Sequence, residues 1–342
     1  MPEQSPEATA PDVAGKFYRL PDHYEVGREK VREYARAVQN SHPAHISELH
    51  AAKLGFDGVI APPTFASAIG FHPTRALFET VFEDFDISLV LQVEQIFELY
   101  QPLVAGDRVH AQIEIPSIRN VRGSDFVTVK VSFIGTDGVV RQSATVQLVA
   151  RSGELPPEVL SMIEGVVMHL TPDETAGLVE IDPADAAAPR ELADARANTV
   201  VNTRPRFEDL SVGDELPIGI RSVTRGDLVN YAGVSGDHNP IHFSDRAAEV
   251  AGLPTVVAHG MLTLGLAADF LSSWLDDPSA IESLSFRFSG FVPVQQIGAT
   301  EIEFTGKVKS LDPVRRTAQI LLSGTSEGKK LFGRALAQVQ LS

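Results

Sequence analysis

Two residues that could exchange protons with a small molecule, Asp237 and His242, stand five positions apart within the stretch Tyr231–His242, YAGVSGDHNPIH. Proline disfavours helix at the residue before it, so Pro240 predicts a tight loop here and not a helix face. A loop can aim a carboxylate and an imidazole at one point, and the amide of Asn239 can tie such a loop to itself. The spacing therefore predicts an acid–base pair held on a loop.

An apolar segment that follows this loop, Gly260–Leu275, predicts a helix. A helix that begins at glycine has free backbone N–H groups and the positive end of the helix dipole at its start. Such an end can bind an oxyanion. A carboxylate, an imidazole and an anion-binding helix end together suit proton abstraction next to a carbonyl.

The histidines allow a second interpretation, a metal site. His42, His45 and His50 lie close together in the sequence, as do His238 and His242. Neither group has a carboxylate or cysteine at a recognised metal-site spacing, so we expect no metal. A third interpretation, a loop-capping aspartate beside an incidental histidine, fits Asp237 and His242 less well because the whole surrounding motif is present.

An internal repeat determines where these residues belong in the fold. Residues 28–61 and 225–258 share at least nine identities at a single offset of 197 residues, without a gap. The pairs are Arg28/Arg225, Tyr34/Tyr231, Ala35/Ala232, Pro43/Pro240, His45/His242, Ala51/Ala248, Gly55/Gly252, Val59/Val256 and Ala61/Ala258. A length of 342 residues favours two domains, and the repeat predicts two copies of one fold.

Each copy continues with a helical segment and then with strands of period-2 alternation, such as Val127, Val129, Val131 and Phe133. The strands expected in the second copy are Leu284–Phe291, Thr300–Leu311, Arg315–Gly324 and Leu331–Leu341. The fold class is therefore α+β, with one helical region against an antiparallel sheet in each copy. Between the copies, Pro172–Thr203 is rich in Ala, Asp and Pro and indicates an exposed linker, and Leu155–Leu170 before it predicts a short capping helix.

The motif Asp-x-Asn-Pro-Ile-His, followed by Ala258-His-Gly-Met261, resembles the signature of the MaoC-like dehydratases. The resemblance covers roughly residues 206–342 and implies a hot-dog fold, a long helix wrapped by an antiparallel sheet, in tandem here. The whole chain resembles a fused (3R)-hydroxyacyl-acyl-carrier-protein dehydratase, with a degenerate HadA-like half first and a catalytic HadB-like half second. The expected organisation is a disordered leader over 1–15, hot-dog domains over 16–170 and 206–342, and a linker over 171–205.

The resemblance implies that Asp237 and His242 are the catalytic dyad, that the N–H of Gly260 holds the thioester oxygen, and that Asn239 and Ser235 orient the loop. In the first copy Asn40, His42 and Pro63 replace Asp237, Asn239 and Gly260, so we expect that half to be inactive and His45 to be structural. Candidates for an acyl tunnel, which core packing explains equally well, are Phe65, Ile69 and Phe71. Candidates for contacting the phosphate of a carrier are Arg204, Arg206, Arg287, Arg315 and Arg316.

The implied activity is that of a hydro-lyase, which interconverts (3R)-3-hydroxyacyl and trans-2-enoyl thioesters on an acyl carrier protein, in fatty-acid or mycolic-acid-type elongation. An (R)-specific enoyl-CoA hydratase and a non-catalytic acyl-binding module are the alternatives, and the proton roles within the dyad could be reversed. No cofactor is implied, because the thioester carbonyl itself acidifies C2. We expect the two hot dogs to pair within the chain, and whether two chains form a homodimer stays open.

Composition limits the classes of partner and the location. The net charge of −16 argues against nucleic-acid binding, which needs a basic face. It also excludes a global attraction to an acidic carrier, so a local basic patch is required. No segment approaches the roughly 18 apolar residues of a membrane span. The chain has no cysteine, which fits the cytoplasmic location that we expect.

Overall fold

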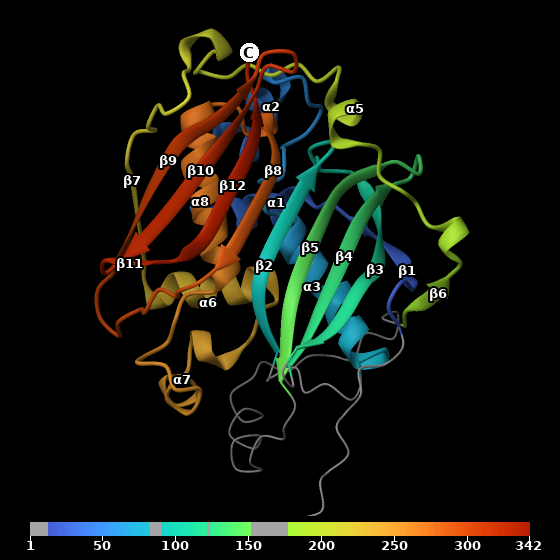
Figure 1. The fold of residues 1–342 in the computed structure, drawn as a ribbon, viewed down its shortest axis with the longest axis vertical. Coiled ribbons are helices and arrows are strands. Elements are labelled where there is room, and N and C mark those ends of the chain that lie inside the picture. The colour runs from blue at the N-terminus through green and yellow to red at the C-terminus, as the bar shows by residue number, and fades with distance from the viewer. Residues whose placement is uncertain (1–12, 83–89, 122–123, 152–176) are drawn as a thin grey trace, which may run out of the picture.

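The computed structural model describes residues 13–82, 90–121, 124–151 and 177–342. Its strands form one antiparallel sheet in the order β6-β1-β3-β4-β5-β2-β8-β12-β10-β9-β7, with the short strand β11 paired to β10 (Figure 1). Helices α1 (Arg28–Ala37), α3 (Ala66–Thr80) and α8 (Gly260–Leu275) lie behind this sheet in the view of Figure 1, whereas α7 (Asp245–Val250) lies below it. The expected α+β class, a long helix against an antiparallel sheet in each half, is confirmed.

The first half and the connecting segment supply the strands at one end of the sheet. Their elements are β1 (Phe17–Glu25), α1 (Arg28–Ala37), η1 (Pro43–His45), α2 (Glu48–Lys53), α3 (Ala66–Thr80), β2 (Val90–Leu99), β3 (Arg108–Val121), β4 (Ser124–Gly135), β5 (Val140–Arg151), β6 (Val179–Ile181), η3 (Pro183–Asp185) and α5 (Leu192–Arg196). The predicted alternation is confirmed on β4, where Val127, Val129, Val131 and Phe133 are all buried.

The second half repeats the same order of elements. They are η4 (Phe207–Asp209), β7 (Gly219–Val223), α6 (Arg225–Ser235), η5 (Pro240–His242), α7 (Asp245–Val250), α8 (Gly260–Leu275), η6 (Pro278–Ala280), β8 (Ile281–Phe288), β9 (Thr300–Asp312), β10 (Thr317–Ser326), β11 (Lys329–Lys330) and β12 (Phe332–Gln340). At the offset of 197 residues, η1 corresponds to η5 and α2 to α7 with identical bounds, so the repeat in the sequence is a repeat in the fold.

The two halves join edge to edge through β2 and β8, which pair antiparallel from Glu94↔Arg287 to Glu98↔Ser283. One continuous hydrophobic core extends under both halves of the sheet. Helix α8 of the second half packs closely against the first, because a Cβ at Gly265 would lie 2.6 Å from Cγ1 of Val38. The expected pairing of two hot dogs within the chain is therefore present.

The predicted helix Gly260–Leu275 is confirmed at both ends, whereas the strand expected at Leu284–Phe291 begins and ends three residues earlier, as β8. The chain turns away after Phe288 because the N–H groups of Ser289 and Gly290 both donate to the carbonyl of Leu331. At Gly290 a Cβ would lie 2.3 Å from the carbonyl oxygen of Lys330, so glycine alone permits this close approach.

The segment between the halves is more closely packed than we expected. Strand β6 pairs with β1, and Arg196 in α5 is 1% exposed, whereas most side chains around them are exposed or half-buried, and the linker stays a prediction. Its guanidinium donates to the carbonyls of Leu99 and Ser279, one in each half, and lies 3.5 Å from Glu282. The helix expected at Leu155–Leu170 lies outside the described residues.

Two residues that we expected in the leader are part of the folded structure, since Val13 is buried in the core and Gly15 donates its N–H to the carbonyl of Ile115. The domain boundaries as a whole stay a prediction. Within the described ranges, none of the helices has both the length and the apolar character needed to cross a bilayer.

Candidate active site

The loop between α6 and η5 presents Asp237. A capping box of Thr224 and Asp227 begins α6, and Gly236 ends it in the left-handed conformation, with φ 82°. Glycine adopts this conformation without a steric penalty, and the reversal directs the chain out of the helix. Pro240 begins η5 directly afterwards, so Asp237 stands on the short loop that the sequence predicted.

Local hydrogen bonds fix this loop. The N–H of Asp237 donates to Oγ of Ser235 at 3.2 Å, and the Ser235 hydroxyl donates to the carbonyl of Tyr231 at 2.7 Å. The N–H of Asn239 donates to the Asp237 carboxylate at 3.3 Å, and the Asn239 side chain accepts from the N–H of Ile241 at 3.2 Å. Ser235 and Asn239 therefore lie where loop-orienting residues must lie.

His242 is 7% exposed, and its Nδ1 lies 2.8 Å from the carbonyl oxygen of Val257. A carbonyl can only accept, so Nδ1 carries the proton and Nε2 of the neutral ring keeps its lone pair. Burial lowers the pKa of His242, and the neighbouring Asp237 carboxylate partly offsets that effect. The ring is thus held neutral, with one nitrogen ready to accept a proton.

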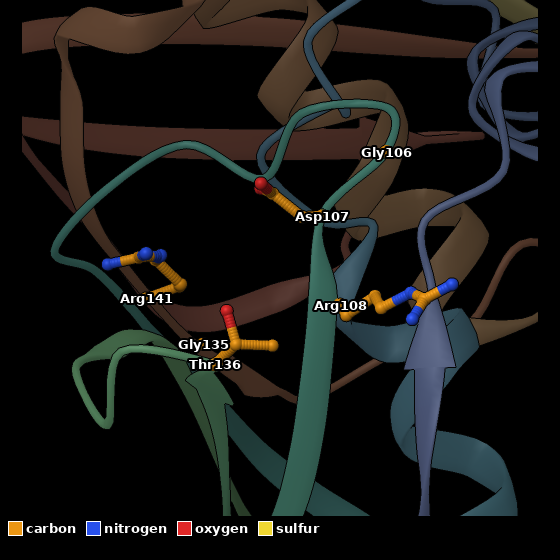
Figure 2. Close-up of a pocket in the computed structure, with 6 residues that line it drawn as sticks. All are labelled: Gly106, Asp107, Arg108, Gly135, Thr136 and Arg141. Carbon is orange, nitrogen blue, oxygen red and sulfur yellow. The ribbon is translucent and has the colours of Figure 1, made fainter.

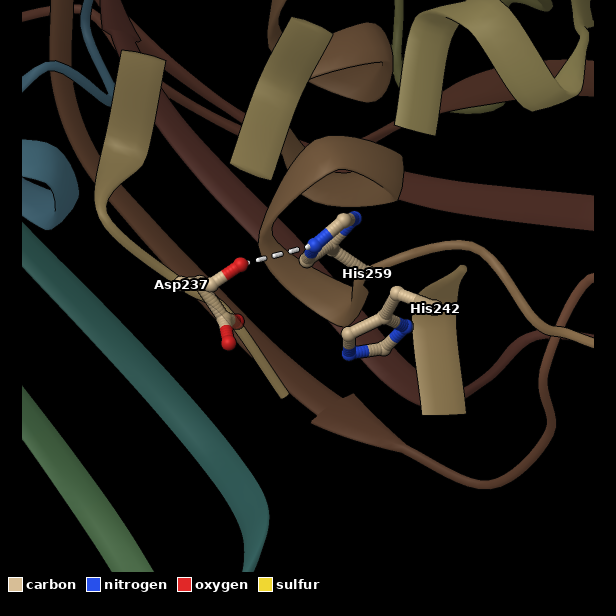
Figure 3. A group of neighbouring side chains, drawn as sticks. All are labelled: Asp237, His242 and His259. Carbon is tan, nitrogen blue, oxygen red and sulfur yellow. Dashed lines mark hydrogen bonds between the residues drawn. The ribbon is translucent and has the colours of Figure 1, made fainter. Parts of the chain in front are cut away.

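A second histidine, His259, packs against His242. Their ring centroids are 3.8 Å apart with 26° between the planes, and His259 is completely buried. Its Nε2 lies 3.2 Å from the main-chain carbonyl of Asp237, shown by the dashed line in Figure 3, so Nε2 is the donor. His259 therefore ties the Asp237 loop to the start of α8. Burial lowers the pKa of His259 well below its usual value.

Asp237, His242 and His259 each offer a nitrogen or oxygen atom within 4.8 Å of the others (Figure 3). Such a set could in principle bind a metal ion. The lone pair of an imidazole nitrogen lies in the plane of its ring, however, so the stacked rings of His242 and His259 do not direct their lone pairs at one shared point. The Nε2 of His259 is also already used as a hydrogen-bond donor. The geometry suits proton transfer better, and the expectation of a metal-free site stays a prediction.

The N-terminal end of α8 lies beside this group. Gly260 is the first residue of the helix and is exposed, and a Cβ there would lie 3.3 Å from the ring of Phe288. The first N–H groups of a helix have no acceptor within it and carry partial positive charge. The loop and the helix start therefore bring a carboxylate, a neutral imidazole and an anion-binding end together.

The first half contains the counterparts of Asp237 and His242, but both are buried. His45 is fully buried, and its Nδ1 lies 2.6 Å from the carbonyl of Ile60, the position that corresponds to Val257. Asn40 replaces the aspartate and is 2% exposed. Within the described ranges, the buried atoms His45 Nε2 and Asn40 Nδ2 have no hydrogen-bond partner. Burial lowers the pKa of His45 to about 4.

The three acyl-tunnel candidates differ in position. Phe65 is completely buried and packs edge-on against Tyr34, and Ile69 is 6% exposed within the core. Phe71 is half-buried, and its ring faces the Asp237 loop, with its centroid 6.1 Å from that of His238. Of the three, Phe71 is the one that the structure brings to the loop.

Four of the five arginine candidates lie away from the site. Arg204 pairs with Asp276, just past the C-terminal end of α8, a 16-residue helix whose length is roughly 24 Å. Arg315 pairs with the buried Glu282, and Arg316 pairs with Glu208. Arg206 stands next to η4, which contains Glu208. Arg287 alone lies near the start of α8, since it precedes Phe288.

A separate small pocket of about 180 Å³ lies in the first half, lined by Gly106, Asp107, Arg108, Gly135, Thr136 and Arg141. The two guanidinium groups point in opposite directions in Figure 2. Arg141 pairs with Asp137 and Arg108 with Glu25, and Asp107 accepts from the N–H of Val104. The pocket contains none of the loop residues above, and its charged side chains already have partners.

Comparisons with known proteins agree with this geometry. Residues 13–142 match the family model described as "FAS1-like, dehydratase domain region", and residues 213–322 match the "MaoC like domain". The UPF0336 protein Rv0635 of Mycobacterium tuberculosis is 36% identical over 147 residues, which are 43% of this chain and 93% of that protein.

Two solved structures are similar over nearly the whole chain. One, described as a MaoC-like dehydratase, is 40% identical with a TM-score of 0.88 and covers 98% of this chain and 100% of its own. The other, Rv0216 of Mycobacterium tuberculosis, described as having a double hotdog fold, is 13% identical with a TM-score of 0.62, covers 96% of each chain and shows the fold alone. The chain therefore belongs to the MaoC-like dehydratases, has a double hot-dog fold, and falls in a family whose activity is that of a hydro-lyase.

Proposed function

We propose that the protein reversibly removes water from a (3R)-3-hydroxyacyl thioester held on an acyl carrier protein, in fatty-acid or mycolic-acid-type elongation. The observation that carries this proposal is the convergence of Asp237 and His242 within 4.8 Å beside the first residue of α8. The similarity of the first half to FAS1-like dehydratase regions supports an acyl substrate of this class.

In the elimination direction, neutral His242 takes the C2 proton through Nε2, which is free because Nδ1 is bonded to Val257. The electrons of the C2–H bond form the C2–C3 double bond, and the C3 hydroxyl leaves as water with a proton from protonated Asp237. The N–H of Gly260 stabilises the charge that develops on the thioester oxygen. Transfer of the proton from His242 to Asp237 then restores the starting state.

The hydration direction reverses these steps. The Asp237 carboxylate takes a proton from water as the water oxygen adds to C3, and protonated His242 delivers a proton to C2. Asp237 is half-buried and so can reach a water molecule, whereas His242 and His259 are buried. We assign the water to Asp237 on this difference in exposure.

The proposal includes the partner and the location. The acyl chain would extend past Phe71, which faces the loop. The two hot dogs of one chain are already joined edge to edge through β2 and β8. The cytoplasmic location and the carrier stay predictions, and activity on coenzyme A thioesters alone would support the degradative hydratase instead.

The dyad is tested by Asp237→Asn and His242→Ala, assayed by hydration of a trans-2-enoyl thioester. We expect kcat to fall by about 10²–10⁴ in each, the usual contribution of a general acid or base. His45→Ala is the matched control, because it removes the corresponding histidine of the closed site, and its kcat should stay within a few-fold of wild type. Circular dichroism must remain native-like in all three. Near wild-type turnover in Asp237→Asn or His242→Ala would show that the assignment is wrong.

A further inference from the structure

Four cationic side chains gather at the end of the sheet where β8 ends and β12 begins. Arg287 on β8 and Arg334 on β12 are direct cross-strand partners, and Lys329 and Lys330 form β11 beside them. All four are exposed, and none has an ion pair or side-chain hydrogen bond with any part of the chain that the structure describes. We call this group the cationic rim.

The stability of the fold does not explain the rim. Like charges directly opposite each other on an antiparallel pair repel and are destabilising, and Arg287 and Arg334 stand in that relation. Glu94 lies in register with Arg287 on β2, yet the two make no ion pair. In a chain with a net charge of −16, many carboxylates could have neutralised these arginines. Unpaired and mutually repelling cations are instead available to an anionic partner.

The rim is joined to the active site by a short stretch of chain. The N–H groups of Ser289 and Gly290 donate to the carbonyl of Leu331, which directly follows Lys330. Two residues further on, the carbonyl of Val292 accepts from the N–H of Ala258, which precedes His259. Strand β11, the end of β8, and helices α6 and α7 all lie at the same end of the molecule (Figure 1).

We propose that the cationic rim is the docking surface for an acidic acyl carrier protein, an inference that rests on the proposed function. The carrier would place its acidic side chains against Arg287, Arg334, Lys329 and Lys330, and its thioester arm would enter beside Phe288 toward Gly260. Complementary charge of this kind acts mainly on encounter and orientation, so the rim would set KM and not the chemical step.

The test compares two substrates of one acyl chain, trans-2-enoyl carrier protein and trans-2-enoyl pantetheine, which lacks the protein surface. The variant is the double charge reversal Arg287→Glu/Arg334→Glu. Its matched control is Arg19→Glu/Lys309→Glu, which changes the net charge equally at two exposed cations without ion pairs, on β1 and on the far part of β9. Both substrates are assayed at low and high salt, and the thermal midpoint is measured for each protein.

We expect the rim variant to raise KM for the carrier substrate by about tenfold or more at low salt, with kcat retained and the pantetheine substrate unaffected. High salt should raise KM of the wild type toward that of the variant, because screening weakens the attraction. The thermal midpoint of the rim variant should fall only slightly, because the reversal again places like charges opposite each other and adds Glu94 to them. The control should behave as wild type.

Three outcomes would overturn the inference, and they differ in what they say about the function. Wild-type behaviour of the rim variant toward the carrier substrate would reject the rim and leave the proposed function in place. Equal losses on both substrates would place the arginines in the support of the active site. Failure of the wild type to use the carrier substrate, with turnover of the pantetheine substrate, would reject both the rim and the carrier as substrate while keeping the dyad.

Discussion

At the start of α8, Gly260 has a backbone N–H and lacks a Cβ. Replacing it by proline and by alanine separates the effects of these two properties. Proline removes the backbone N–H that we assign to the thioester oxygen, while its ring suits the first position of a helix. The residue before a proline must be extended, and His259 already has φ −55° and ψ 134°. Gly260→Pro should therefore keep the helix and lose the donor.

Gly260→Ala is the control for the added side-chain carbon. Both variants place a Cβ 3.3 Å from the ring of Phe288, a tight contact that a shift of a few tenths of an ångström in the ring can relieve. The alanine variant keeps the N–H, so its loss of activity measures this contact alone. We expect that loss to be within a few-fold.

The removal of one donor to a developing oxyanion costs about 10²–10³ in kcat, or roughly 3–4 kcal/mol of transition-state stabilisation. Gly260→Pro should lose activity by that factor on an enoyl-pantetheine substrate, with KM nearly unchanged and native-like circular dichroism. Equal losses in the proline and alanine variants would assign the effect to crowding of Phe288. Full activity in the proline variant would refute the role of the Gly260 N–H.

Two further predictions concern stability. The pKa of the buried His45 is about 4 in the folded protein, so folded His45 stays neutral while the unfolded chain, with a pKa of about 6.5, gains a proton as the pH falls. The contribution of His45 to stability is therefore present above pH 6.5 and is lost between pH 6.5 and 4, by about 3 kcal/mol in total. Urea unfolding at pH 7.5 and 4.5 measures this loss, and the free energy of unfolding should fall less in His45→Asn than in wild type. An equal fall in both proteins would contradict the buried neutral state. Arg196→Met should lower the free energy of unfolding by roughly 3 kcal/mol. This is the low end of the range for breaking a buried ion pair, because Glu282 keeps its second partner, Arg315. A loss below about 1 kcal/mol would show that the Arg196 guanidinium does not join the two halves.

The parts of the site that the sequence could predict are those that are local in the chain. Asp237 and His242 are joined by a loop whose course follows from Gly236 and Pro240, and the start of α8 at Gly260 follows from the apolar run behind it. The repeat at 197 residues predicted the matching elements of the two halves. These features depend on neighbours within a few residues, or on a comparison of the chain with itself.

The features that the sequence could not predict depend on strand register and on contacts between segments that are distant in the chain. The stacking of His259 on His242 requires the segment around Val257 to lie against η5, where His242 bonds to the carbonyl of Val257, and no local pattern specifies that contact. The pairing of Arg287 with Arg334 likewise requires the register of β8 and β12. The motif did contain His259, directly before the helix glycine, and that position was the available signal.

Burial distinguishes the two related loops, and under the proposed function it explains why only the Asp237 loop would be an active site. A carboxylate at the position of Asn40, which is 2% exposed, would be costly to ionise, and a neutral amide avoids that cost. The loss of the acid and the closure of the site therefore go together. Each of the unpartnered atoms His45 Nε2 and Asn40 Nδ2 costs roughly 1–3 kcal/mol, which a core built only for packing would avoid with apolar side chains. They occupy the positions that correspond to His242 and Asp237, and His45 keeps the hydrogen bond of its Nδ1 to a main-chain carbonyl.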